Sequence, residues 1–230
     1  MISSIILFAQ TSGPEFAMEL TQKAGAGEIS FLSLFLKGGY ILIPIVLLSF
    51  VAVYLIIKKY LDIRRTLFID PGYVDHFNEL LKSGDLKAAS VHLQHDNSSY
   101  SNIFRHALPK IGKSSEEIES TLESASNIEV AKVSKHLGYL GLIAGIAPML
   151  GFIGTISGII KIFYNISLTD NISIGIISGG LYEKMISSGS GLIVGIIAFT
   201  GYHMLNMRID RFISEVEEEA FVFMNIVNNK

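Results

Sequence analysis

Three long apolar stretches, separated by polar segments, dominate the hydrophobic pattern of this chain. They run over residues 38–57, 137–163 and 181–205. The second is the clearest, because the twenty-four residues from Leu137 to Ile160 contain no Lys, Arg, Asp or Glu. A helix needs about 20 apolar residues to cross a membrane. The pattern therefore predicts three transmembrane helices.

Between the first two stretches, residues 58–136 are polar but carry apolar residues at helical spacing. Four apolar residues share one face of the first predicted helix there: Val74, Phe77, Leu80 and Leu81. Three more follow a turn at residues 83–85: Ala88, Val91 and Leu93. Ser114 and Glu117 have the spacing of a capping box. We therefore expect a domain of short helices, ending in a helix from Glu116 to His136 that continues directly into the second span.

The third stretch is followed by an amphipathic pattern that predicts a helix over 206–230. Its apolar side consists of Ile209, Phe212, Ile213, Val216 and Ala220. Its charged side consists of Arg208, Arg211, Glu215, Glu218 and Glu219. Such helices often pack against copies of themselves. The acidic cluster is most simply a solvated face, although in a ring it would line an inner mouth with carboxylates.

Basic residues are distributed unevenly along the chain. Two Lys or Arg residues precede the first span, eleven lie between Lys58 and Lys135, and three lie from Arg208 onward. The positive-inside rule then places the N-terminus outside and residues 58–136 and 206–230 in the cytoplasm. The apolar start of residues 1–37 has no preceding Lys or Arg, so we expect an exported segment rather than a cleaved signal peptide.

Composition agrees with a membrane protein and excludes other classes. Half of the residues are hydrophobic, 17% are charged and the formal net charge is −3. The absence of Cys removes disulfides and thiolate chemistry, and no basic stripe indicates a nucleic-acid partner. His92 and His95 form the only His pair at a helical ligand spacing, and solvated histidines explain them better than a metal site. We expect no metal, no cofactor and, without a clustered nucleophile and base, no enzyme.

The second and third stretches each carry a narrow stripe of small residues with one hydroxyl. In the second, Gly151, Thr155 and Gly158 share a face, and Gly154 lies beside them. In the third, the aligned residues are Ser188, Gly191, Gly195 and Ala198. Close helix packing, with hydroxyls bonded to backbone carbonyls, is the simplest explanation. An ion path is the alternative.

The depth of the two hydroxyls favours the ion path. Thr155 lies eight residues from Phe163 and Ser188 lies eight residues from Gly180. Both would therefore lie about 12 Å below the outer boundary, where they could form one polar ring beside an ionisable group. No Asp or Glu lies deep in any predicted span. A partner membrane helix would have to supply the carboxylate, with several copies of this chain around it.

Two charged residues, Glu183 and Lys184, stand at the outer start of the third span. They lie about 100° apart on a helix, and Lys184 is one turn above Ser188. Snorkelling interface charges are one interpretation. The other is a charged vestibule, in which Glu183 acts at the outer mouth and pairs with a neighbouring subunit.

Two stretches carry a family resemblance: Leu140-Gly-Leu-Ile-Ala-Gly-Ile-Ala-Pro-Met-Leu-Gly-Phe-Ile-Gly-Thr155-Ile-Ser-Gly158 and Glu183-Lys-Met-Ile-Ser-Ser188-Gly-Ser-Gly191. They resemble the signature helices of the MotA/TolQ/ExbB proton channel family. The likeness extends to the Gly38-Gly39 start, the order of the spans and the large segment between them. Thr155 and Ser188 match the pore threonines of the family, and Glu183 matches its Glu. Three spans rather than four favour the ExbB/TolQ branch.

The resemblance implies an all-α, polytopic protein of the bacterial inner membrane. It implies a homopentameric ring around two helices of a single-span ExbD/TolR-like partner, with residues 1–37 and 164–180 in the periplasm. Proton flow past the partner's Asp would energise TonB-dependent outer-membrane transport or the Tol system, through a TonB-like or TolA-like transducer. Channel-lining roles would fall to Thr155, Ser188 and Glu183, and helix packing to Gly151, Gly154, Gly158, Gly191 and Gly195.

The sequence departs from the family pattern at three positions. Ser188 replaces the family's Thr but keeps the hydroxyl. Lys184 stands where Ala is usual, and Ile197 replaces the customary Pro of the third span. A ring of lysines above the hydroxyls would oppose cation conduction. A non-conducting membrane scaffold is therefore the alternative function, and the choice between H⁺ and Na⁺ stays open.

Overall fold

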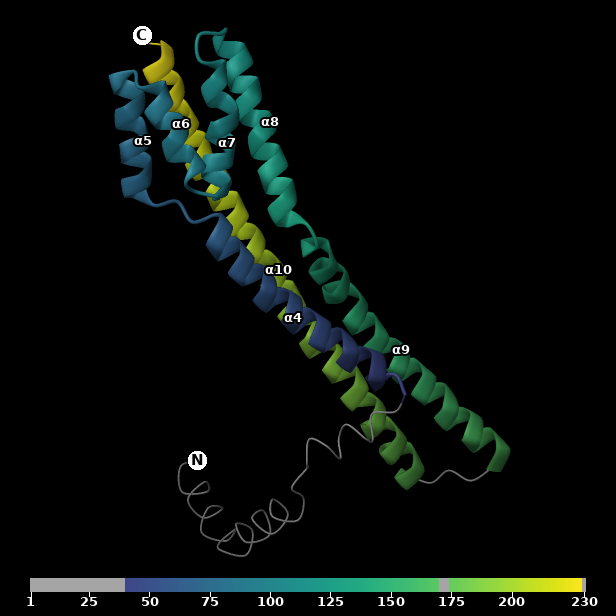
Figure 1. Cartoon of the computed structure of the whole chain (residues 1–230). Helices are drawn as coiled ribbons and strands as arrows, with labels where there is room; N and C mark the ends of the chain where they lie inside the picture. Colours follow the sequence, from purple (N-terminus) through teal and green to yellow (C-terminus); the bar gives the residue numbers. More distant parts are fainter. Residues whose placement is uncertain (1–39, 170–173, 229–230) are drawn as a thin grey trace, which may run out of the picture.

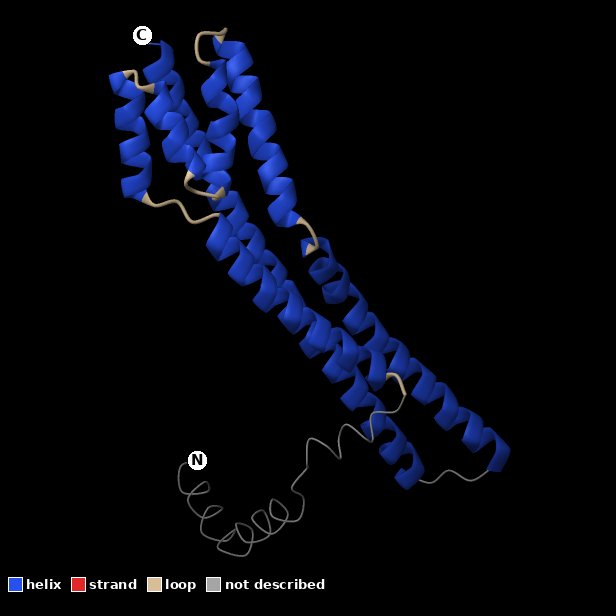
Figure 2. Ribbon diagram, in the orientation of Figure 1, coloured by secondary structure: helices blue, strands red, loops and turns tan. Residues whose placement is uncertain are grey.

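Every regular element in the described part of the chain is helical, which confirms the predicted all-α class. The computed structural model describes residues 40–169 and 174–228, except for the side chains of Thr169, Ile176 and Glu183. Figure 2 shows helices joined by short loops, and Figure 1 shows them aligned along one long axis. The predicted N-terminal segment, 1–37, lies outside the described residues.

Three of the described helices are long and apolar enough to cross a membrane: α4 (Leu42–Thr66), α9 (Leu137–Thr169) and α10 (Ile174–Asn228). The prediction of a multi-pass membrane protein with three candidate spans is therefore confirmed. The helices α9 and α10 extend beyond the predicted spans, since residues 164–169 and 174–180 are helical. The helix α4 begins at Leu42, four residues after the start of the first predicted span, and continues past its end to Thr66. The boundaries of the bilayer along these helices stay a prediction.

The helix α10 organises the molecule, because both α4 and α9 pack along it (Figure 1). The faces of α4 and α9 that point away from α10 carry large exposed apolar side chains, among them Phe50 and Phe152. An apolar surface of this extent is costly in water and is suited to lipid.

A second packed unit, here called the polar bundle, lies at the end of the molecule that carries the C-terminus (Figure 1). It consists of the C-terminal part of α10 and four helices: α5 (Pro71–Ser83), α6 (Leu86–Gln94), α7 (Ser99–Ala107) and α8 (Ser115–Ser134). A single turn of 3-10 helix, η1 (Leu108–Lys110), follows α7.

The core of the polar bundle is aromatic and includes the end of α10. The ring of Phe223 stacks on Phe77 of α5, with centroids 6.4 Å apart, and contacts Phe104 of α7 at 5.5 Å. Ile209, Phe212 and Val216 are buried as the amphipathic pattern predicts. Part of the apolar face of this helix is thus buried within its own chain, while Ile213 and Ala220 stay partly exposed. Packing against a copy of itself stays a prediction.

Local capping explains where α5 and α6 begin and end. Asp70 caps α5 by accepting a hydrogen bond from the Gly72 amide at 3.1 Å, and Gly84 closes it with φ of 84°, a conformation that glycine adopts at no steric cost. Asp85 then caps α6. The predicted face of α6 is wrong at Val91, which is exposed, because Ala89 and Leu93 are the residues that point into the core.

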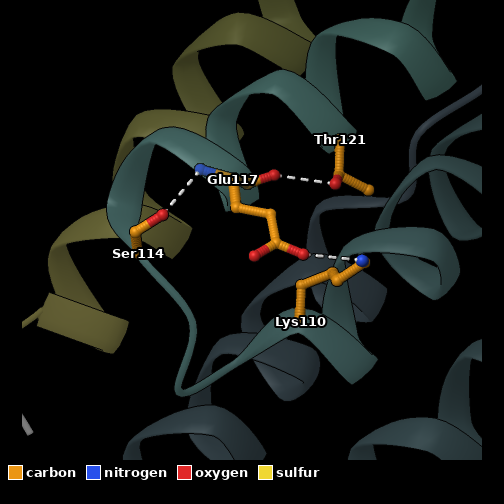
Figure 3. Close-up of polar contacts among 4 residues, drawn as sticks. All are labelled: Lys110, Ser114, Glu117 and Thr121. Carbon is orange, nitrogen blue, oxygen red and sulfur yellow. Dashed lines mark hydrogen bonds and ion pairs between the residues drawn. The ribbon is translucent and has the colours of Figure 1, made fainter.

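The N-terminus of α8 contains half of the predicted capping box (Figure 3). Ser114 Oγ accepts a hydrogen bond from the Glu117 amide at 3.3 Å, which confirms Ser114 as the N-cap. The Glu117 carboxylate does not return to the Ser114 amide; it accepts from Lys110 Nζ at 2.8 Å instead. This ion pair ties η1 to α8 and holds the pKa of Glu117 below its usual range.

The helix α8 does not continue into α9, contrary to the prediction. It ends at Ser134, Lys135 is extended, and His136 has φ of 73°, a left-handed conformation that is uncommon for a residue with a side chain. At this break Lys59 of α4, which is buried, donates from Nζ to the Val133 carbonyl at 3.1 Å. The helix end is therefore satisfied by a cation from another helix, a partner that no local sequence signal reveals.

A compact polar cluster fixes the turn between α6 and α7. The Asp96 carboxylate accepts hydrogen bonds from the Ser98 hydroxyl, the Ser98 amide at 3.2 Å and the Ser101 hydroxyl at 2.9 Å. Burial raises the pKa of Asp96, but these hydrogen bonds outweigh it and hold the pKa below its usual range.

His92, one of the two predicted surface histidines, stacks on Tyr73 with ring centroids 4.0 Å apart.

Candidate functional site

The two stripes of small residues face each other where α9 and α10 pack. A Cβ atom added to Gly191 would lie 2.5 Å from the Ala147 carbonyl oxygen, and one on Gly151 would lie 3.0 Å from the Ser188 Cα. A Cβ on Gly195 would meet the Pro148 ring at 2.5 Å. The backbones therefore approach as closely as they do only because these positions carry no side chain.

Two further glycines of α9 accommodate side chains from α10 rather than its backbone. A Cβ on Gly154 would lie 2.8 Å from Ser187 Oγ and 3.4 Å from Ile41 Cγ2, so three helices meet there. Gly158 faces the aliphatic part of Lys184, whose Cε would lie 2.5 Å from an added Cβ. All five glycines predicted to pack helices thus lie in one contact within a single chain.

Thr155 lies in this contact with its hydroxyl hydrogen directed at backbone carbonyls. Its Oγ1 donates to the Gly151 carbonyl at 3.2 Å and lies 3.4 Å from the Lys184 carbonyl of α10. A threonine hydroxyl has one hydrogen and two lone pairs, so this arrangement leaves lone pairs available to accept or coordinate. The residue is half-buried rather than sealed, and this leaves part of its surface open at the edge of the contact.

Ser188 belongs to the same contact but not to the same level. Its backbone lies against Gly151, whereas Thr155 lies against Lys184. Since Gly151 and Thr155 are four residues apart, the two hydroxyl-bearing residues are staggered by about one helical turn, roughly 6 Å. The structure of one chain therefore brings Thr155 and Ser188 to neighbouring levels of one contact, rather than to the common level expected from counting residues.

The third predicted channel residue, Glu183, lies in the helical backbone of α10, but its side chain is outside the described residues. Its neighbour Lys184 is half-buried at the contact. The position of the Glu183 carboxylate relative to Thr155 stays a prediction.

Sequence reasoning missed one hydroxyl of this contact, Ser187. Its side chain is fully buried against Gly154, and its Oγ is without a hydrogen-bond partner. A signal was available, because Ser187 precedes Gly191 and Gly195 by four and eight residues and so continues their stripe. The alignment chosen from the sequence used the three-residue step to Ser188 instead.

The chemistry that these residues offer is that of hydroxyls and carbonyls. Among the described residues, no group of three or more His, Cys, Asp or Glu could hold a metal ion. Any titratable carboxylate beside Thr155 must come from Glu183, from another copy of the chain or from a partner helix. The arrangement can support a polar path but supplies no proton carrier among its described side chains.

Comparisons with known proteins agree with this picture. Residues 95–218 match the MotA/TolQ/ExbB proton channel family, a range that covers α7, α8, α9 and the α9–α10 contact but not α5 or α6. A putative biopolymer transport protein ExbB homolog from Methanothermobacter thermautotrophicus is 29% identical over 189 residues. That match covers 81% of this chain and 66% of the relative, just under two thirds of its length.

Proposed function

Since the chain belongs to the MotA/TolQ/ExbB proton channel family, we propose that it is an ion-conducting subunit of an ExbB/TolQ-like membrane motor. The observation that carries the proposal is the geometry of Thr155 between α9 and α10. Its hydrogen is directed at two carbonyls, so its lone pairs are available to a proton-bearing water or a hydrated cation. Ser188 extends this polar surface one turn further along the same contact.

The α9–α10 contact has no titratable carboxylate among its described side chains, and this indicates what a partner has to supply. Since the described part of α9 and the apolar part of α10 offer no deep carboxylate, a membrane helix that carries an Asp must pass beside Thr155. A single-span ExbD/TolR-like protein meets this need, and a homopentameric ring of this chain around two such helices presents one Thr155 per subunit. Glu183 would act at the outer mouth of that ring.

The cellular setting follows from the same proposal. The chain would lie in a bacterial inner membrane with its N-terminus outside and the polar bundle in the cytoplasm, in accordance with the excess of Lys and Arg between Lys58 and Lys135. Proton flow would energise TonB-dependent outer-membrane transport or the Tol system through a TonB-like or TolA-like protein.

The test is ion flux in liposomes that contain the chain together with its single-span partner. Thr155→Ala removes the hydroxyl, and we expect at least a tenfold loss of proton flux with assembly intact, because a polar stage of the path disappears. Thr200→Ala is the matched control: it makes the same change at an exposed position of α10, away from the contact, and should conduct like wild type. Neutralising the partner's Asp should abolish flux. Normal flux through Thr155→Ala would refute the proposal.

One observation supports a second candidate function, a membrane scaffold that assembles a partner complex without conducting. Lys184 is half-buried beside Thr155, where a cation disfavours the passage of other cations. A scaffold would assemble with the partner and show no flux for H⁺ or Na⁺ in any variant. Parallel measurements with pH-sensitive and Na⁺-sensitive dyes separate the two functions and identify the ion.

A further inference from the structure

Lys184 is held at the α9–α10 contact by a feature of α9, the missing side chain of Gly158. A Cβ atom added to Gly158 would overlap Lys184 Cγ and Cδ and would lie 2.5 Å from Cε. The aliphatic part of the lysine therefore lies flat against α9, in the space that a side chain at position 158 would need. Gly151, Gly154, Gly191 and Gly195 face backbone, Pro148, Ser187 or Ile41, so Gly158 is the one among these five glycines that accommodates a charged residue.

The same lysine contacts Thr155 through its backbone. The Thr155 hydroxyl lies 3.4 Å from the Lys184 carbonyl, while the Lys184 side chain leaves that level and reaches Gly158. Gly158 is three residues beyond Thr155 on α9, about 4.5 Å further toward the predicted outer end. This direction agrees with the tilt of helical side chains toward the N-terminus of their own helix, which for α10 is the same end.

We propose that Gly158 is a positioning residue that keeps the Lys184 ammonium on the outer side of the Thr155 hydroxyl, out of the path of cations. The inference rests on the proposed conducting function and explains how that function tolerates a lysine one turn from Ser188. A side chain at position 158 would force Lys184 into another conformation, and a conformation directed away from the outer end would bring the ammonium group nearer to the hydroxyls. There it would lower the local occupancy by cations by about tenfold or more.

The primary test is Gly158→Ala, measured as proton flux in liposomes that contain the complete complex. The added methyl group meets only a flexible side chain, so the complex should assemble while Lys184 is displaced. We expect flux to fall about tenfold or more, in line with the repulsion between like charges at close range. Gly145→Ala, where an added Cβ meets nothing within 4 Å, is the matched control and should conduct like wild type.

A second substitution separates charge from packing. Lys184→Met keeps a side chain of similar length but removes the charge, so Gly158→Ala/Lys184→Met should recover most of the wild-type flux. The same Lys184→Met change should not rescue Gly154→Ala, whose added methyl group meets Ser187 and Ile41 instead of the lysine. Flux that stays low in Gly158→Ala/Lys184→Met would overturn the proposal in favour of a packing defect.

A chemical measurement tests whether Gly158 positions the Lys184 side chain, and it does not depend on ion conduction. Acetylation of lysines, mapped by mass spectrometry in the assembled complex, should modify Lys184 severalfold more in Gly158→Ala than in wild type. Equal modification of Lys184 in the two proteins would overturn the proposal that Gly158 positions this lysine. A wild-type complex that carries no flux would instead overturn the proposed function and the role given to Lys184 within it. Flux that falls in Thr155→Ala but is unchanged in Gly158→Ala would overturn the role of Gly158 and leave the proposed function intact.

Discussion

At the scale of single residues, the α9–α10 contact contains two hydroxyls with opposite environments. Thr155 donates to a carbonyl and remains half-buried, whereas Ser187 is fully buried and its Oγ is unpartnered. A buried hydroxyl without a partner costs about 1–3 kcal/mol relative to its hydrated state. Spacing along the helix identifies Thr155 and also places Ser187 on the stripe of small residues. It could not show that the Ser187 hydroxyl lacks a hydrogen-bond partner, because this depends on how α9 and α10 pack.

This contrast predicts that Ser187→Ala stabilises the isolated protein. Removing the unpartnered hydroxyl should raise the free energy of unfolding by about 1 kcal/mol, since no hydrogen bond is lost with it. Thermal unfolding in detergent checks the prediction, and Ser178→Ala serves as the comparison because Ser178 is exposed and bonds to the carbonyl of Ile174. A lower melting temperature for Ser187→Ala would contradict the prediction, because it would mean that the Ser187 hydroxyl makes a stabilising hydrogen bond in the isolated protein.

At the scale of elements, the pairing of α9 with α10 depends on positions that cannot accept a methyl group. The sequence could predict both stripes because residues three and four apart share a helical face. It could not predict their register, which depends on side chains of both helices and produces the stagger between Thr155 and Ser188. Nor could it predict the break at His136, because residues 134–136 include neither Pro nor Gly and because Lys59 of another helix satisfies the end of α8.

The pairing predicts a sharp difference between two glycines of α10. Gly191→Ala would place a methyl group 2.5 Å from the Ala147 carbonyl oxygen and 3.1 Å from the Gly151 Cα, atoms that cannot move without separating the helices. We expect a loss of about 1–3 kcal/mol in the free energy of unfolding. Gly189→Ala meets nothing within 4 Å and should be neutral or slightly stabilising, because Ala favours the helix. Equal melting temperatures for the two variants would contradict the observed packing.

At the scale of the whole molecule, the apolar helices and the polar bundle differ in their dependence on pH. The bundle contains carboxylates whose pKa values are held low, at Asp96 by hydrogen bonds that outweigh burial and at Glu117 by Lys110. Burial instead raises the pKa of Glu219, which accepts a hydrogen bond from Asn78 at 3.3 Å. The stretch from Leu137 to Ile160 has no such group. The amphipathic pattern predicted the buried face of α10, but not that Glu219, assigned to its charged side, would pack against α5.

The lowered pKa values of Asp96 and Glu117 set the sign of the dependence of the bundle's stability on pH. A carboxylate with a lowered pKa in the folded state stabilises the fold above its ordinary pKa, near 3.9 for Asp, and loses that contribution as the pH falls through the lowered value. We therefore expect the polar bundle to lose stability below about pH 4, while the apolar helices stay folded. Asp96→Asn should reduce the acid dependence of the bundle's melting temperature. Circular dichroism in detergent as a function of pH measures both, and an unchanged acid profile in Asp96→Asn would contradict the role of that carboxylate.

The unbroken length of α10 has a mechanical consequence. Its 55 residues form a rod of about 82 Å, so a tilt of about 5° at the apolar end displaces the other end by about 7 Å. The neighbouring route through α9 and α8 is interrupted at Lys135 and His136, where the helix breaks. We therefore expect α10 to carry a small rearrangement next to Thr155 into the polar bundle, where Phe223 packs against both Phe77 and Phe104.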